Sequence, residues 1–514
     1  MRVTFVVMGW ENISVEYISA YLKQRGHDVS LAYEQSLFDD KNYLCIPFAA
    51  KIFDQGSNII RQVIDTKPDI VAFSVLAVTF QWALQRASTI KRYLDVPIIF
   101  GGTHAITCPE RLIKKDPVDI VCIGEGEHAL ADLLDSMKEG KINTSLKGLW
   151  FKAKSGEIIE NERRPLIADL DSMPLPDKDL FAPFIPIKNY YLAATSRGCP
   201  FSCTYCSVSY VSDIEKNTEN FKKVRERSVD SVMEELKINK AKYNFKWVDF
   251  RNSVFSPQKN WVLDFCEKYT KAINLPFRIF GHPLLINKET AIALKEARCF
   301  GIQIGLESYD SHIRNNILKR PETNEQIHHA VDILEKYKVP YSLDYILGLP
   351  GQGEQELRTA AEFFSGLRHC YRISPFMLSY LPKLKIIDYA IEHDMLNKDE
   401  PEKIEEGLHG NYMDKGSDME KKRRRLMQTY KLLFRSMSFM PTWLKKPFYK
   451  SKLYFIFYII PFDFILRTFD LSMVLRDRDA RAYALNYLWW FRKRFNRSHP
   501  NYFFKHIKSN VHKK

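Results

Sequence analysis

The sequence lacks an apolar run long enough to cross a membrane. The longest run, residues 453–466, contains Pro461 and Asp463 and falls well short of roughly 20 residues. The N-terminus also lacks the pattern of a signal peptide, because residues 1–8 read as a strand and a helical pattern follows at once. We therefore expect a cytoplasmic protein that is kept in a reducing compartment.

Cysteine is scarce, and six of the nine cysteines stand alone in apolar or loop contexts, which predicts ordinary buried thiols. The other three, Cys199, Cys203 and Cys206, have the spacing C-x3-C-x2-C. A zinc knuckle is the alternative for this group, but zinc prefers paired C-x2-C spacings and the sequence has no second pair. Three thiols suit a four-iron cluster that leaves one iron open to a small molecule.

This spacing, with Tyr205 just before the last cysteine, resembles the motif of the radical S-adenosylmethionine (radical SAM) superfamily. The resemblance implies that the three cysteines hold a [4Fe-4S] cluster and that S-adenosylmethionine chelates the open iron. It also implies that electron transfer cleaves S-adenosylmethionine to a 5′-deoxyadenosyl radical. A reductant protein such as flavodoxin or ferredoxin is the partner that this chemistry implies.

Residues 1–140 alternate strand and helix patterns in the way that builds a parallel sheet. Strands are predicted at residues 2–8, 29–33, 69–74, 97–100 and 119–123. Ligands of such sheets bind at the carboxyl ends of the strands, and glycine-rich loops follow the last two of these strands. A nucleotide-binding Rossmann unit is the alternative, but no G-x-G-x-x-G follows the first strand.

These loops resemble those of the cobalamin-binding domain that precedes the radical core in one large radical SAM class. The motif D-x-H-x-x-G, which gives cobalt a histidine in many cobalamin enzymes, is absent here. We therefore expect the histidine of the Gly-Gly-x-His loop to hydrogen-bond near the corrin edge, with cobalt coordination as the alternative. The resemblance implies cobalamin contacts from Ser74, Thr79, Gly101, Gly102, Thr103, His104, Gly124, Glu125, Gly126 and Glu127.

Residues 141–189 are predicted to form an extended linker, because prolines and aspartates alternate towards its end. Six strand and helix pairs follow over residues 190–396. Six pairs are too few for a closed eight-unit barrel and match the partial (β/α)6 barrel of the radical SAM family. The predicted fold class is thus α/β, with a Rossmann-like parallel-sheet cobalamin-binding domain, a partial barrel and a mainly helical C-terminal region.

Three further motifs at strand ends resemble radical SAM patterns. Gly305-Leu306-Glu307-Ser308 resembles Gly-x-Glu-Ser, which implies that Glu307 accepts a hydrogen bond from S-adenosylmethionine; capping of the next helix is the alternative. The loop around Asn252 resembles F-x-D-D-x-F but has no carboxylates, although an amide still hydrogen-bonds a ligand. Gly348 opens a G-L-P-G loop, where close approach to the adenosine is expected. The implied contacts of S-adenosylmethionine are Tyr205, Asn252, Glu307 and Gly348.

The formal net charge of +14 is concentrated in the last fifth of the chain. Residues 421–514 contain 23 Lys and Arg and four acidic residues, interleaved with aromatic runs. The rest of the chain has an acidic excess, so we expect no nucleic-acid partner. Residues 397–514 are predicted to be a basic, mainly helical region that either packs on the protein or contacts the anionic inner face of a membrane.

The resemblance covers about residues 1–395 and implies a cobalamin-dependent radical SAM enzyme. The implied reaction is methylation of an unactivated carbon of a small-molecule or lipid-like substrate, through a 5′-deoxyadenosyl radical and methylcobalamin. A cyclase, oxidase or rearrangement enzyme that uses the same cofactors is one alternative. A non-catalytic binding or sensory protein is the other, and the intact cysteine motif argues against it.

Overall fold

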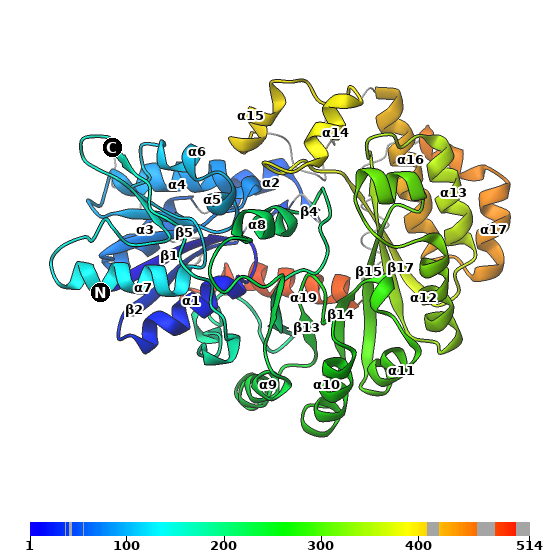
Figure 1. Ribbon diagram of the computed structural model, residues 1–514, viewed down its shortest axis with the longest axis horizontal. Coiled ribbons are helices and arrows are strands. Elements are labelled where there is room, and N and C mark those ends of the chain that lie inside the picture. Colours follow the sequence, from blue (N-terminus) through cyan, green and yellow to red (C-terminus); the bar gives the residue numbers. More distant parts are fainter. Residues whose placement is uncertain (36, 41–43, 55, 409–420, 460–477, 500–514) are drawn as a thin grey trace.

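The computed structural model describes residues 1–35, 37–40, 44–54, 56–408, 421–459 and 478–499. Two α/β units make up most of it (Figure 1): one runs from blue to cyan at the left, and one from green to yellow at the right. Each unit is built on its own mainly parallel sheet with helices packed against it.

The N-terminal sheet has seven strands in the order β2-β1-β5-β6-β7-β8-β9. Its five parallel strands are buried along most of their length, as their apolar sequences require. They confirm the five strands predicted for this part of the chain. Their bounds are β1 (Arg2–Met8), β2 (Asp28–Glu34), β5 (Ile70–Ser74), β6 (Ile98–Gly101) and β7 (Ile120–Cys122).

The strand order of this sheet changes direction between β1 and β5. The chain leaves β1 for β2 on one side and then returns to β5 on the other. Loops diverge at such a point and leave room for a ligand at the carboxyl ends of the strands. The connecting elements are α1 (Ile13–Gln24), β3 (Asp39–Asp40), β4 (Leu44–Cys45), α2 (Pro47–Ile52), α3 (Gly56–Thr66), the 3-10 turn η1 (Ala77–Thr79), α4 (Phe80–Lys91), α5 (Thr103–Thr107), α6 (Pro109–Ile113) and α7 (Gly126–Lys138).

The structure differs from the expectation of an extended linker over residues 141–189. Strands β8 (Leu149–Lys152) and β9 (Ile158–Ile159) extend the N-terminal sheet, with β8 antiparallel to β7. The physical reason is that β7 would otherwise be an unpaired edge, and Leu149 and Phe151 alternate into the core beside it. The 3-10 turns η2 (Leu170–Ser172) and η3 (Lys178–Leu180) follow.

Six parallel strands form the second sheet, in the order β10-β13-β14-β15-β16-β17. They confirm the partial barrel. Their bounds are β10 (Tyr191–Ala193), β13 (Val248–Phe250), β14 (Phe277–Gly281), β15 (Cys299–Glu307), β16 (Tyr341–Leu347) and β17 (Cys370–Met377). The accompanying helices are α9 (Val229–Tyr243), α10 (Lys259–Ala272), η4 (Pro283–Leu285), α11 (Lys288–Glu296), the π-helical η5 (Ile313–Ile317), α12 (Asn324–Lys336) and α13 (Glu354–Ser365).

A short ribbon and a helix lie between the two sheets. Strands β11 (Ser196–Gly198) and β12 (Val224–Glu226) pair antiparallel, and α8 (Ser207–Glu215) lies between them in the chain. In Figure 1, α8 faces the N-terminal sheet on one side and the barrel on the other. The cysteine motif connects the end of β11 to the start of α8.

The described part of the C-terminal region is helical, as predicted. After α14 (Ile386–Glu392), which closes the barrel segment, its elements are α15 (Glu400–Glu405), α16 (Lys421–Met437), α17 (Thr442–Lys450), η6 (Leu453–Tyr458) and α19 (Arg478–Lys493). Helix α16 buries Tyr430, Leu433 and Phe434 completely in the main core. Helix α19 reaches the N-terminal half, where Trp490 Nε1 donates to Phe184 O at 2.8 Å. None of the helices in the described residues is both long and apolar enough to span a bilayer.

Candidate functional site

A cavity of about 530 Å³ lies at the carboxyl ends of β1, β5, β6 and β7. Its opposite wall comes from α8 and from the β11–β12 ribbon, including Arg197, Gly198 and Ser207. The cavity therefore separates the N-terminal sheet from the segment that contains the three cysteines. Eight of the ten residues predicted to contact cobalamin line it: Ser74, Gly101, Gly102, Thr103, Gly124, Glu125, Gly126 and Glu127.

The glycines of this lining let the backbone form the cavity wall. Gly102 has φ +92°, and a Cβ there would lie 2.8 Å from the backbone nitrogen of Val75, so the turn into α5 requires glycine. A Cβ at Gly124 would meet no protein atom within 4 Å. Ser74 Oγ accepts a hydrogen bond from Asn12 Nδ2 at 3.1 Å, across the point where the strand order reverses. These residues fit a flat ligand such as a corrin laid on the strand ends.

Thr79 and His104 lie away from the cavity, unlike the other predicted cobalamin contacts. Thr79 Oγ1 accepts from the backbone of Leu76 at 3.0 Å and so closes the η1 turn. His104 points into the protein and packs on the ring of Phe80, with ring centroids 4.7 Å apart. Burial lowers the pKa of His104 to about 4. No histidine is among the described residues that line the cavity.

The carboxylates of Glu125 and Glu127 point to protein cations. Arg197 donates to Glu125 at 2.6 Å and to Glu127 at 2.5 Å. Arg225 also donates to Glu125, at 3.0 Å. These cations lower the pKa of Glu125, although burial opposes them. The loop after β7 is thus bound to the ribbon that leads into the cysteine motif.

The cysteine loop is fixed at both ends by backbone contacts. Gly198 has φ +92°, and a Cβ there would lie 2.1 Å from the Lys223 carbonyl oxygen, so glycine is required. The same carbonyl accepts from the amide of Cys199 at 3.0 Å. In the middle of the loop, Thr204 Oγ1 donates to Ile317 O at 2.7 Å, and Cys206 is the residue at the start of α8. The loop therefore spans the gap from the ribbon to η5.

The three thiols of the motif do not converge as closely as the ligands of a single metal ion do. Among the described residues, the one set of three potential ligands whose atoms converge within 4.8 Å is Cys108, Glu110 and Glu405, elsewhere in the fold. Burial raises the pKa of Cys203 to about 11, so metal binding has to displace the thiol proton. This donor set fits a [4Fe-4S] cluster.

Glu307 ends β15 in a left-handed backbone conformation, with φ +62°. A Cβ at Gly305 would lie 2.5 Å from Glu307 Oε1, so glycine at 305 leaves the space that the carboxylate occupies. Burial raises the pKa of Glu307 to about 7, with Arg320 opposing the shift. A strained, half-buried carboxylate at a strand end is typical of a ligand site. The ligand role of Glu307 remains a prediction.

A buried network of charged side chains, which no sequence motif predicts, lies beside the cysteine loop. Arg320 donates to Glu322 at 2.6 Å, to Gly305 O at 2.6 Å and to the hydroxyl of Tyr205 at 3.2 Å. Glu322 also pairs with His282 at 3.4 Å. No motif indicates these residues. The one signal in the sequence is that Arg320 and Glu322 flank Pro321 in the segment between two apolar strands.

The stacking partner of His282 is Phe201, which lies within the cysteine motif. The two rings are nearly parallel, with centroids 3.7 Å apart. The network of Arg320, Glu322 and His282 therefore contacts the loop on the barrel side. Its side chains can hold the loop in place and present a positive charge beside the three thiols.

Asn252 and Gly348 shape the barrel mouth through internal hydrogen bonds. Asn252 Nδ2 donates to Ser196 Oγ at 2.8 Å, and Asn252 Oδ1 accepts from the amide of Thr195 at 3.3 Å. Gly348 has φ +84°, and its amide donates to the buried Gln352 side chain at 2.7 Å. The backbone conformation of the G-L-P-G loop is therefore stabilised by hydrogen bonds to the Gln352 side chain. The direct ligand contacts of both residues remain predictions.

A hydrogen-bonded belt of polar side chains crosses the inner face of the barrel sheet. Arg278 on β14 binds Asp249 on β13 at 2.7 Å, and Gln303 on β15 binds Asp344 on β16 at 2.6 Å. Tyr345, next to Asp344, packs on Phe364 of the outer helix α13, so Asp344 faces inward. Burial raises the pKa of Asp344. The interior of the barrel is therefore polar.

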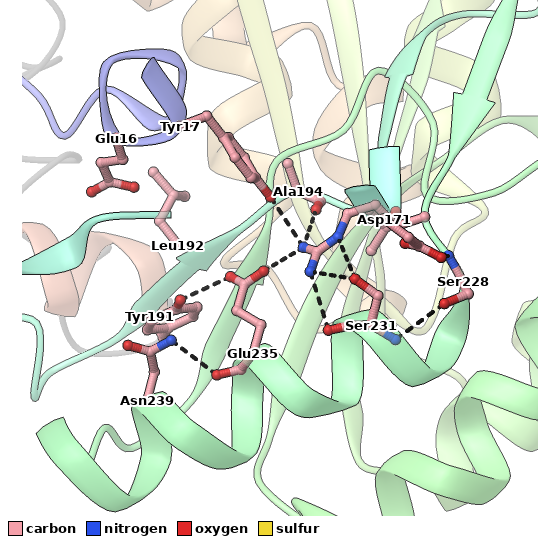
Figure 2. Close-up of polar contacts among 12 residues, drawn as sticks. Glu16, Tyr17, Asp171, Tyr191, Leu192, Ala194, Ser228, Ser231, Glu235 and Asn239 are labelled. Carbon is pink, nitrogen blue, oxygen red and sulfur yellow. Dashed lines mark hydrogen bonds and ion pairs between the residues drawn. The ribbon is translucent and has the colours of Figure 1, made fainter. Parts of the chain in front are cut away.

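A second buried polar group joins α1 to the barrel (Figure 2). The guanidinium of Arg227 donates to the Tyr17 hydroxyl at 3.0 Å and to Ala194 O at 3.3 Å, and it pairs with Glu235. Glu235 accepts from the Tyr191 hydroxyl at 2.8 Å. Tyr17 comes from the N-terminal unit and the others from the barrel, so the two units meet through specific hydrogen bonds.

Lys178, in η3, completes this contact. Its ammonium group donates to Glu11, Glu16 and the carbonyl of Leu192, each at 2.7 Å. Burial raises the pKa of Glu16 well above its usual value, although Lys178 opposes the shift. The segment expected to be a linker thus holds α1 against strand β10.

The chain matches two known domain families in sequence. Residues 3–134 match the B12 binding domain, and residues 194–364 match the radical SAM superfamily. The chain belongs to the radical SAM enzymes that carry a B12-binding domain. It is a cobalamin-dependent radical SAM enzyme, and its cofactors are a [4Fe-4S] cluster, S-adenosylmethionine and cobalamin.

Relatives of this enzyme differ in the reactions for which they are named. An uncharacterised methyltransferase of Pyrococcus horikoshii is 26% identical over 394 residues, 75% of this chain and 79% of the relative. The anaerobic magnesium-protoporphyrin IX monomethyl ester cyclase of Rubrivivax gelatinosus is 21% identical over 468 residues, 86% of this chain and 76% of the relative. The solved cobalamin-dependent S-adenosylmethionine radical enzyme OxsB has a TM-score of 0.66 at 16% identity and covers 99% of this chain and 84% of its own; it supports the fold.

Proposed function

We propose that this enzyme methylates an unactivated carbon of a small-molecule or lipid-like substrate. The observation that carries the proposal is the cavity, which is lined on one side by glycine-rich strand ends and on the other by the ribbon and helix around the three cysteines. When bound, the cofactors supply a 5′-deoxyadenosyl radical and a methyl group on cobalamin. A cavity between the two sites keeps a reactive carbon away from water.

The protein's own residues would hold and shield these groups. Cys199, Cys203 and Cys206 would ligate the cluster, and Glu307 and Tyr205 would contact S-adenosylmethionine. The polar belt from Asp249 to Asp344 would orient the polar end of a substrate inside the barrel. Ser74, Gly102 and Gly124 would support the corrin from the sheet.

Product analysis tests methylation directly. Anaerobically reconstituted enzyme would be incubated with S-adenosylmethionine carrying a labelled methyl group, a reductant, and metabolite or lipid extracts. We expect a product that carries the label and is heavier by one methyl group. A product of unchanged methyl content, formed together with 5′-deoxyadenosine, would instead assign the enzyme to the ring-forming or oxidising reactions, as the similarity to a cyclase allows.

We further propose that α17 and η6 contact an anionic membrane surface. Four large apolar side chains are exposed there: Trp443 (75%), Leu453 (63%), Ile456 (56%) and Ile459 (76%). Residues 421–459 contain 11 Lys and Arg and no acidic residue. Such a surface suits the interface of a bilayer with acidic lipids, where each basic residue contributes about 1 kcal/mol.

Vesicle flotation tests this contact. We expect the enzyme to float with anionic vesicles in low salt, and substitution of both Trp443 and Ile459 by Ser to abolish flotation. Ile238→Ser, at an exposed apolar position on α9, is the matched control and should float normally. Equal flotation with neutral vesicles, or none with either kind, would contradict the proposal.

A further inference from the structure

Two arginines lie directly opposite each other on the β11–β12 ribbon. The register pairs Arg197 with Arg225 across the two antiparallel strands. Like charges at directly opposed positions destabilise a strand pair. The ribbon is only three residues long on each side, so it has few other contacts with which to offset this repulsion. Its stability therefore depends on what neutralises the two cations.

The neutralising charges come from the other unit of the protein. Glu125 and Glu127, in the loop after β7, form ion pairs with Arg197 at 2.6 and 2.5 Å. Glu125 also pairs with Arg225 at 3.0 Å. Two carboxylates thus balance two guanidinium groups, and each member of the set has a partner.

These ion pairs are largely shielded from water. The side chains of Glu127 and Arg225 are 4% and 7% exposed, and that of Arg197 is 26% exposed. Arg197 also lies over the ring of Tyr17 at 5.6 Å, so α1 covers it on a further side. Removing one member would leave a buried charge uncompensated, which is strongly destabilising.

Both ends of this contact lead to a cofactor site. Arg197 is two residues before Cys199, and Gly198 between them is fixed against the Lys223 carbonyl. On the other side, Gly124 and Gly126 line the cavity with their backbone while the glutamates beside them bind the ribbon. A ligand that orders this loop would therefore also position the two carboxylates.

We propose that Glu125, Glu127, Arg197 and Arg225 form a latch that couples the cobalamin site to the cluster loop. Cobalamin in the cavity orders the loop after β7, the loop neutralises the ribbon, and the ribbon fixes the start of the cysteine motif. Arg197 is thus a positioning residue for the cluster. Because coupling between two sites is reciprocal, the assembled cluster should tighten cobalamin binding by the same factor.

The latch assigns Glu125 and Glu127 a role that differs from direct contact with the corrin. It holds whether the reaction that follows is methylation or another radical reaction, because it concerns binding and order alone. Its test therefore needs neither substrate nor turnover.

Amide hydrogen exchange of the full-length protein tests the latch. Exchange in peptides that cover residues 195–206 would be measured in cluster-free protein with and without saturating hydroxocobalamin. In the wild type we expect cobalamin to slow exchange by about tenfold, within the 5–150-fold range usual for coupled sites. In Arg197→Gln the slowing should disappear, whereas the exposed Lys216→Gln, which removes the same charge after α8, should retain it.

A second measurement separates the latch from a merely structural role. Hydroxocobalamin affinity would be titrated by absorbance with and without the reconstituted cluster. We expect the cluster to tighten binding by about tenfold in the wild type and to have no effect in Glu127→Gln or in the double variant with Arg197→Gln. If Arg197→Gln does not fold by circular dichroism, Glu127→Gln replaces it in the exchange experiment.

Two results would overturn the latch. One is cobalamin-dependent slowing of equal size in the wild type and in the latch variants. The other is a cobalamin affinity of the wild type that is the same with and without the cluster.

Discussion

The sites at the strand ends of the two sheets differ in the residues that shape them: glycines at the N-terminal sheet and charged side chains at the barrel. At the N-terminal sheet, glycines shape part of the cavity wall, because a side chain at Gly102 would crowd Val75 and one at Gly124 would project into open space. At the barrel, the corresponding site is made of charged side chains: Arg320 and Glu322 are buried, and Glu307 is half-buried. A large flat ligand needs a smooth surface, whereas a small zwitterion needs fixed charges. The contrast shows that each sheet is adapted to a different kind of cofactor.

The largest effect is expected at the cysteine motif, because a cluster cannot assemble without its ligands. Cys203→Ala should lose the [4Fe-4S] absorbance and all reductive cleavage of S-adenosylmethionine. Cys266→Ala, which removes an isolated buried thiol in α10, should keep both. Full cleavage in the Cys203 variant would refute the assignment of the cluster.

The next largest effect is expected on the free energy of unfolding, when the charged site of the barrel is broken. Arg320→Met leaves the fully buried Glu322 without its main cation, which is expected to lower the free energy of unfolding by about 3–5 kcal/mol. The same substitution at Arg358, in an exposed pair with Glu354, should cost less than about 1 kcal/mol. Thermal and denaturant unfolding measure both. Equal losses of stability in the two variants would show that the buried ion pair contributes no more than the exposed one.

Breaking the backbone site of the N-terminal sheet tests the other side of the comparison. Gly102→Ala places a Cβ 2.8 Å from Val75 in a glycine-only conformation and should cost about 3 kcal/mol and weaken cobalamin binding. Gly140→Ala, at φ +84° with no atom within 4 Å, should cost about 1 kcal/mol and leave binding unchanged. Absorbance titration with hydroxocobalamin distinguishes them. Similar binding in both variants would show that the turn does not form the corrin site.

An effect of at most similar size is expected from pH, through His104. The pKa of His104 in the folded protein, about 4, is below the usual value near 6.5, so above pH 6.5 the residue is neutral in both states and costs nothing. As the pH falls from 6.5 to 4, His104 binds a proton in the unfolded chain but stays largely neutral in the folded protein. Stability should therefore fall, by up to about 3 kcal/mol.

The variant His104→Leu isolates this contribution. The difference in unfolding midpoint between wild type and variant should change between pH 7 and pH 4, because the other titrating groups are common to both. A difference that is constant with pH would show that His104 is not buried in its neutral form.

How far the sequence predicts this molecule depends on how local each signal is. The strand and helix pairs of both sheets and the cysteine motif follow from short patterns of apolar residues, glycine and cysteine. The contact of Arg197 with Glu127 joins residues 70 apart, and that of Arg320 with Tyr205 joins residues 115 apart. No local pattern indicates such pairs. Strands β8 and β9 form because the edge strand β7 needs a partner, and their own sequence carries no distinctive strand pattern from which they could be predicted.

His104 and Thr79 show the limit of a motif. Both stand where the cobalamin class has them, yet the turn at Gly102 directs His104 onto Phe80 and Thr79 closes its own turn. A motif fixes which residues are present, whereas the direction of each side chain depends on the packing around it.

If a cluster on the cysteine loop and a cobalamin on the strand ends lie on opposite sides of the cavity, their unpaired electrons should interact, and electron paramagnetic resonance measures this interaction. Protein that holds both a reduced [4Fe-4S] cluster and cob(II)alamin would be compared with Cys203→Ala protein that holds cob(II)alamin alone. We predict that the cob(II)alamin signal is broadened or split by the neighbouring cluster spin in the first sample. Identical cob(II)alamin signals in the two samples would show that the two cofactors do not share the cavity.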